Sequence, residues 1–134
     1  MPRCRCPRYW HNVPRTARQT QNATYFSVGL QSKYREDSEG AIRNFEQALR
    51  YLPDDAASMF ELSEQYYNVG RIEDAFNMIQ RAAEIDPDNK WYQMRLGVFY
   101  RNLEQYDDFA KLYENLTARE VPERSFYFYY FFFF

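Results

Sequence analysis

A pattern that recurs every 34 residues constrains this chain more than any other feature. The pair Val28–Gly29 is followed by Leu62–Ser63 and then by Leu96–Gly97. A second set of positions has the same period and reads alanine, a large apolar residue, alanine and proline: Ala41, Phe45, Ala48 and Pro53, then Ala75, Ile79, Ala82 and Pro87. A fixed period of this length is typical of a stacked-repeat protein, in which each unit packs only against its neighbours.

Each repeating unit reads as two helices. Apolar residues recur three or four positions apart, which places them on one face of a helix. Proline at Pro53 cannot continue the second helix of the first unit, and Gly70 suits the left-handed residue that follows a helix. The small residues Gly29 and Ala75 stand where paired helices are expected to cross, because a large side chain would push the axes apart there. Ser38 is the expected N-cap of the second helix.

These residues resemble the tetratricopeptide repeat, whose pattern is W-x2-L-G-x2-Y, then A-x3-F, then proline. The resemblance covers residues 22–123, which divide into the units 22–55, 56–89 and 90–123. It implies an all-α fold, a right-handed α-solenoid of antiparallel helix pairs. The third unit departs from the pattern, because Phe109 and Leu116 stand where alanines are expected. Their bulk is expected to splay the last helix pair.

The resemblance also implies a function and a site. Proteins of this family are non-enzymatic interaction modules, and the first helices of their repeats line a concave groove that holds a peptide segment of a partner. Carried over in register, the groove of this chain is expected to be lined by Phe26, Leu30, Lys33, Tyr34, Phe60, Glu61, Glu64, Tyr67, Asn68, Trp91, Met94, Arg95, Val98, Arg101 and Asn102. The alternative is a structural spacer, a fragment of a longer repeat protein with no groove ligand of its own.

The composition of the expected groove indicates the kind of peptide. Aromatic and aliphatic side chains at intervals suit apolar anchors on an extended or helical segment. Glu61 and Glu64 lie one helical turn apart, so their negative field predicts at least one basic group on the peptide. Arg95 and Arg101 on the next unit would favour an acidic group farther along.

The formal net charge of −2 hides an uneven distribution. Residues 1–21 contain five arginines and no acidic residue, whereas residues 22–123 contain 11 basic and 19 acidic residues. The acidic repeat region argues against nucleic acid as a ligand. Residues 1–21, rich in proline and without apolar periodicity, are expected to form a disordered basic leader. A basic arm for nucleic acid or anionic lipid is the alternative.

Enzyme signature motifs are missing from the sequence. The phosphate-binding G-x-x-x-x-G-K-[ST], the nucleophile elbow G-x-S-x-G and the zinc motif H-E-x-x-H are all absent. Cys4 and Cys6 form a C-x-C pair, and His11 alone does not complete a zinc site with them. We therefore expect no enzymatic activity, no cofactor and no metal.

The last residues, 124–134, read RSFYFYYFFFF. This segment is far shorter than the ~20 residues of a membrane-spanning helix. It is expected to begin a truncated fourth repeat that packs on the third, and self-association through it is a further partner class. No apolar segment follows the first arginines, so no signal peptide is visible and a cytoplasmic location is expected. Export is the alternative if the natural N-terminus is missing.

Overall fold

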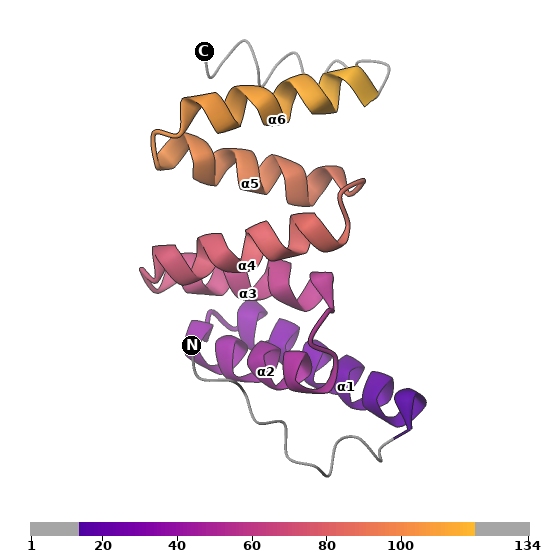
Figure 1. Ribbon diagram of the computed structural model, residues 1–134. Helices are drawn as coiled ribbons and strands as arrows, with labels where there is room; N and C mark the ends of the chain where they lie inside the picture. The colour runs from indigo at the N-terminus through magenta and orange to yellow at the C-terminus, as the bar shows by residue number, and fades with distance from the viewer. Residues whose placement is uncertain (1–13, 120–134) are drawn as a thin grey trace.

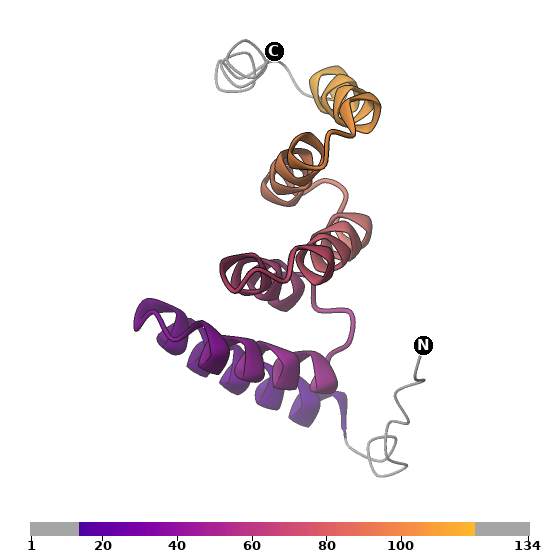
Figure 2. The same ribbon diagram turned by 90° about the vertical axis from the view of Figure 1, so that its left-hand side faces the viewer.

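The computed structural model describes residues 14–119, which form six α-helices and no strand. The helices in chain order are α1 (Arg15–Tyr34), α2 (Ser38–Tyr51), α3 (Ala56–Asn68), α4 (Ile72–Ile85), α5 (Lys90–Asn102) and α6 (Tyr106–Arg119). Successive helices run antiparallel and stack into an elongated solenoid (Figures 1 and 2). The predicted all-α solenoid of antiparallel helix pairs is confirmed. Within residues 14–119, no helix has both the length and the hydropathy to cross a membrane.

The first helix begins earlier than the sequence predicted. α1 begins at Arg15 instead of near Asn22, so residues 15–21 of the predicted disordered leader are helical. This stretch contains two arginines, two glutamines and one alanine, which are good helix formers, and Pro14 stands before it, where proline is tolerated. Residues 1–13, with the rest of the leader, and residues 120–134, with the predicted fourth repeat, lie outside the described residues.

The turn inside each helix pair has the same conformation. Its central residue has a positive φ in all three pairs: 61° at Glu36, 84° at Gly70 and 59° at Glu104. At the middle turn, the backbone N–H of Arg71 donates to the carbonyl of Tyr66 at 2.8 Å, and equivalent bonds close the other two turns. This is the hydrogen bond that ends a helix at a left-handed residue. The 34-residue period therefore extends to the backbone, although only Gly70 is a glycine.

One helix start differs in detail from expectation, and another carries a long-range hydrogen bond. Asp37, and not Ser38, caps α2, since its side chain accepts the backbone N–H of Gly40 at 2.9 Å. Ser38 is instead the first helical residue. The side chain of Asp55 precedes α3 but makes no cap bond. It accepts the Asn22 amide at 3.1 Å and so links α1 to the start of α3.

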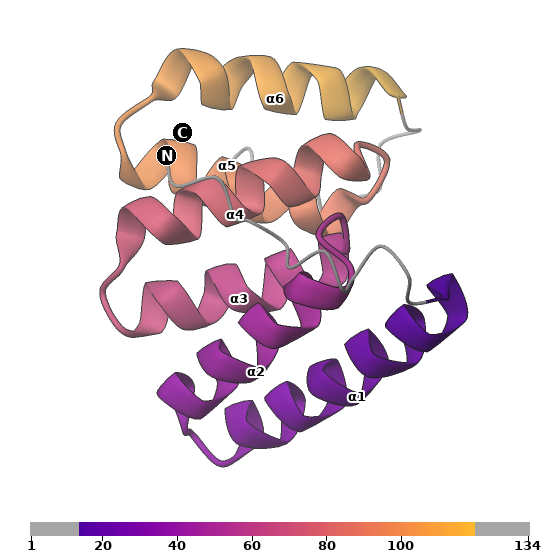
Figure 3. The same cartoon turned by 60° about the horizontal axis from the view of Figure 1, so that its bottom comes forward.

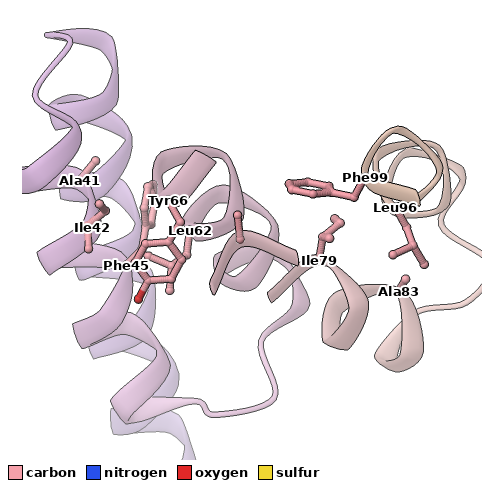
Figure 4. Packing of buried hydrophobic residues seen from close by; sticks show 10 residues of the cluster. Ala41, Ile42, Phe45, Leu62, Tyr66, Ile79, Ala83, Leu96 and Phe99 are labelled. Carbon is pink, nitrogen blue, oxygen red and sulfur yellow. The ribbon is translucent and has the colours of Figure 1, made fainter. Parts of the chain in front are cut away.

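The core follows the predicted small and apolar positions (Figure 4). Ala41, Ser63 and Ala75 have no exposed surface, as expected where paired helices cross. The main cluster runs through the stack and comprises Ala41, Ile42, Phe45, Leu62, Tyr66, Ala75, Ile79, Ala83, Leu96 and Phe99. Its residues come from α2, α3, α4 and α5, so the cluster joins neighbouring pairs of the stack.

The three pairs are not packed equally. α5 and α6 pack least closely of the three pairs, as the bulk of Phe109 predicts. The Phe109 ring lies 4.5 Å from the Tyr113 ring on the same helix. The first pair is turned relative to the rest, and α1 and α2 run obliquely to the later helices (Figure 3). A rotation between units is what generates the extended surface of a solenoid.

Candidate functional site

A hollow of 280 Å³ lies mainly along α3 and α5, and we name it the α3–α5 hollow. Its lining consists of Lys33, Phe60, Glu64, Trp91, Met94, Arg95, Val98 and Tyr113. All of these except Tyr113 belong to the predicted groove. The structure therefore brings together six of the predicted residues of the second and third units, with one lysine from the first.

The remaining predicted groove residues lie elsewhere or are engaged with neighbours. Phe26 and Leu30 pack against the core, and the Phe26 ring lies 5.7 Å from that of Phe45. Tyr34 is exposed at the end of α1. The others do not line the hollow: Glu61, Tyr67, Asn68, Arg101 and Asn102. Ligand binding by any predicted residue stays a prediction.

Two ion pairs connect the first helices of neighbouring units. Lys33 Nζ lies 2.7 Å from Glu61 Oε2, which joins α1 to α3. Arg95 joins α5 to α3, since its Nη2 donates to Glu64 Oε2 at 2.7 Å and its Nε pairs with Glu64 Oε1. Both glutamates expected to attract a basic ligand thus already face a cation of the chain itself.

Glu64 is a carboxyl of the lining whose surroundings shift its pKa. Burial raises the pKa of this carboxyl above 4.5, while Arg95 and Lys33 act in the opposite direction and Glu61 adds to the rise. A partly buried carboxylate is costly without a partner, and a hydrogen-bonded ion pair with arginine offsets this cost. The Glu64–Arg95 pair therefore holds α3 and α5 together at the floor of the hollow.

Aromatic rings hold the Arg95 guanidinium from a second side. It lies 5.6 Å from the ring centroid of Tyr67 and 5.9 Å from that of Phe99. The two rings meet edge to face at 5.6 Å. A cation at this distance from a ring is attracted to its face. Tyr67 therefore positions Arg95 and still leaves 40% of its own surface exposed.

Trp91 is the most accessible apolar group in the lining, with 63% of its surface exposed. It stands in the first turn of α5, where Asn89 Oδ1 accepts its backbone N–H at 3.1 Å. The Phe60 ring, on the opposite helix, is fixed by the Tyr92 ring at 5.2 Å. An exposed indole beside fixed aromatic walls can accept an apolar side chain with little rearrangement.

One lining residue, Tyr113 of α6, is not predicted from the sequence. Its repeat position matches Phe45 and Ile79, which are core residues, so the period indicated burial alone. It is indeed 4% exposed, but its ring passes against Gly97 and its edge reaches the hollow. A glycine on the first helix opposite a long aromatic residue is the signal that could have revealed this.

Comparison with known proteins identifies the fold. Residues 35–93 match the family model described as tetratricopeptide repeat. This match and the fold support the tetratricopeptide repeat family for this chain. Members of this family are generally non-enzymatic interaction modules that bind protein partners. Among residues 14–119, no group of three or more histidine, cysteine, aspartate or glutamate side chains is arranged to hold a metal ion.

Individual proteins resemble this chain at low identity. Superkiller protein 3 of Saccharomyces cerevisiae is 23% identical over 107 residues, which are 80% of this chain but 8% of that protein. The solved structure "Arabidopsis OM64 TPR domain" has a TM-score of 0.73 at 13% identity, covering 87% of this chain and 96% of that one. The structure "MamA RS-1 ArsTM double mutant" has a TM-score of 0.66 at 16% identity, covering 74% and 56%. At these identities the structures establish the fold alone.

Proposed function

We propose that this chain is a scaffold for protein interaction that holds a peptide segment of a partner in the α3–α5 hollow. The observation that carries the proposal is the exposed indole of Trp91 beside a hollow with an apolar wall. The tetratricopeptide repeat fold supports a role in protein interaction generally. The fixed rings of Phe60 and Tyr67 supply preformed area, which reduces the ordering cost of binding.

The size of the hollow favours a peptide over a small cofactor. Its 280 Å³ is slightly below the ~300–1,000 Å³ of sites that enclose drug-sized ligands. One or two side chains of a peptide fit such a volume, and the backbone of the peptide would lie along the first helices. We therefore expect apolar anchors, at least one of them against Trp91.

The charges of the site modify the expected ligand. A basic group on the peptide would compete with Lys33 for Glu61 and with Arg95 for Glu64, since both pairs are already formed. The lining is thus close to neutral where the sequence suggested a negative field. The apolar anchor becomes the main requirement, and a basic group is secondary. A cytoplasmic location stays a prediction.

A role as a structural spacer is the second candidate. It is favoured by the likeness to superkiller protein 3, of whose length the matching part is 8%. Repeats inside a long solenoid can serve to extend the stack, because each unit contacts only its neighbours. A spacer predicts no ligand in the α3–α5 hollow, whereas a peptide site predicts a ligand that depends on Trp91.

The test is a selection of peptides from a displayed random library on the purified chain, followed by affinity measurement with fluorescently labelled peptides. Trp91→Ala is expected to weaken the selected peptides ~30-fold, the equivalent of a hot spot of ~2 kcal/mol. Tyr106→Ala is the matched control, because Tyr106 is also an exposed aromatic residue, at 56%, but lies outside the hollow. Equal affinities for both variants, or no selected peptide, would refute the proposal and favour the spacer.

A further inference from the structure

Exposed apolar side chains gather at the turns inside the second and third helix pairs. The α3–α4 turn presents Val69 and Ile72, and the α5–α6 turn presents Leu103 and Tyr106, with exposed fractions between 37% and 56%. Both turns lie on the same edge of the stack, at the left in Figure 1. We name these four residues the turn edge. None of them lines the α3–α5 hollow, so they form a separate surface.

A second hollow, of 390 Å³, opens beside the α3–α4 turn where it meets α2. Its lining consists of Glu39, Ile42, Arg43, Val69 and Arg71. Arg71 is already engaged, since its Nε donates to Asp74 Oδ2 at 2.8 Å and its guanidinium lies 4.3 Å from the Tyr66 ring centroid. Glu39 and Arg43 stand four residues apart on α2, so their charges offset each other. The hollow can therefore take an apolar side chain at one end of the turn edge.

Exposed carboxylates surround the turn edge. Four of them stand in the same two turns and in the helix starts that follow: Glu73, Glu104, Asp107 and Asp108. None of the four forms an ion pair within residues 14–119. Residues 69–74 and 103–108 contain one cation, Arg71, which is paired with Asp74. The turn edge therefore combines apolar surface with a negative field.

Helix stability does not explain all of these carboxylates. Acidic residues in the first turns of α4 and α6 interact favourably with the helix dipoles. Glu104 lies outside both helices and has a φ of 59°, which a residue with a Cβ disfavours. The equivalent residue of the preceding turn is Gly70, which adopts a positive φ without strain. A strained residue of this kind is a reason to look for a function, and here it adds a charge beside Leu103.

We propose that the turn edge binds a basic segment of a partner protein that also carries apolar side chains. Contiguous exposed apolar surface marks an interaction site, and the carboxylates select lysine or arginine on the segment that covers it. The same negative field disfavours nucleic acid, an anionic membrane surface and the turn edge of a second copy. The inference goes beyond the proposed function, because this surface shares no residue with the α3–α5 hollow.

The test begins with a selection of displayed peptides on the full chain carrying Trp91→Ala, which removes the main apolar anchor of the α3–α5 hollow. Peptides of ~12 residues span ~18 Å as a helix, which matches the ~16–20 Å of the two helix steps between the turns. Enriched peptides are expected to combine lysine or arginine with leucine or aromatic residues. Enrichment of acidic or uncharged sequences, or no enrichment, would overturn the proposal.

An apolar variant locates the selected peptides. Val69→Ser with Leu103→Ser is expected to weaken them at least ~tenfold, because it removes apolar contact from both turns. Ile85→Ser is the matched control, because Ile85 is an exposed aliphatic residue at the end of α4, on the opposite edge of the stack. Equal affinities for the double variant and this control would overturn the proposal.

A charge variant tests the same site without removing apolar packing. Glu73→Gln with Glu104→Gln is expected to weaken the peptides ~threefold at ~0.05 M salt and to have no effect at ~1 M, because salt screens exposed charges. Glu84→Gln, at an exposed glutamate near the opposite edge, should change neither affinity. An unchanged affinity at low salt, or a loss that persists at high salt, would overturn the role of the carboxylates.

Other occupants of the turn edge are distinguished on the unmodified chain. A dimer in sedimentation that Val69→Ser with Leu103→Ser abolishes would assign the edge to a second copy. Binding to vesicles that contain phosphatidylserine, abolished by the same variant, would assign it to a membrane. Either result would overturn the proposal, whereas a variant that affects neither supports it. Peptides that depend on Trp91 are unaffected by these outcomes, so the inference and the proposed function can fail separately.

Discussion

Two glycines at equivalent repeat positions are expected to respond differently to the same substitution. A methyl group at Gly29 would lie 2.6 Å from Cε1 and 2.8 Å from Cδ1 of the Phe45 ring. Phe45 is fully buried and its ring is held by that of Phe26, so it has no direction in which to retreat. At Gly97 the closest atoms are Tyr113 Cε2 at 3.0 Å and Leu112 Cδ2 at 3.3 Å. Here the edge of the ring reaches an open hollow and can move by a few tenths of an ångström.

The magnitudes follow from two opposing effects. Alanine improves the helix by ~1 kcal/mol relative to glycine, and overpacking a core costs ~1–3 kcal/mol. Gly29→Ala should therefore lower the free energy of unfolding by ~1–2 kcal/mol, because the overlap is severe. Gly97→Ala should be neutral or stabilising by up to ~0.5 kcal/mol, because the helix effect offsets the milder overlap.

The assay is urea and thermal unfolding followed by circular dichroism, with both variants in one series. For a domain of this size, ~1 kcal/mol corresponds to ~4–8 °C in Tm. A Gly29→Ala variant that is as stable as Gly97→Ala would show that Phe45 is not fixed against α1. The account of the helix crossings would then be wrong.

Three further predictions test the turns, the ion pair and the crossing of the second pair. Gly70→Ala should lower the free energy of unfolding by ~1 kcal/mol, and Glu104→Gly should raise it by ~0.5 kcal/mol, because only glycine adopts a positive φ without strain. Urea unfolding midpoints that move in the opposite directions would contradict this prediction. Arg95→Met should raise the pKa of Glu64 further, since Arg95 lowers it now. A Glu64 carboxyl pKa that is unchanged in an NMR titration would show that the two side chains do not interact. Because a raised folded-state pKa means that folding favours the protonated form, the stability contribution of Glu64 is lost as pH rises through that pKa, and this loss should be larger in the variant. Ala75→Leu should cost ~1–3 kcal/mol, because Ala75 has no exposed surface at the crossing of α3 and α4, and an unchanged Tm would disprove the crossing.

The repeat period predicted the architecture because it encodes contacts that recur in every unit. Ala41 and Ala75 are buried at crossings, and Gly70 is left-handed, as their positions indicated. Equivalent left-handed turns at Glu36 and Glu104 show that the turn is imposed by packing even where the residue disfavours it. Such tertiary override cannot be read from local composition.

The start of α1 and the pairing of charges between helices could not be predicted from the sequence. Residues 15–21 lack apolar periodicity, so pattern reasoning left them unfolded, although the helix continues through them from Arg15. The pairs Lys33–Glu61 and Arg95–Glu64 join residues about thirty positions apart on neighbouring units. Only the distance and angle between stacked helices decide whether such charges meet, and the period does not specify these.

The central claim is that the α3–α5 hollow binds a peptide, and methionine-methyl NMR tests it most directly. Met94 lines the hollow, whereas Met59 is fully buried and Met78 packs against the core, so the chain contains its own controls. On titration with a selected peptide, the account predicts a shift of the Met94 methyl signal together with the Trp91 indole, while Met59 and Met78 stay in place. A bound peptide that leaves Met94 and Trp91 unshifted would contradict the account, because the binding surface would then lie elsewhere on the solenoid.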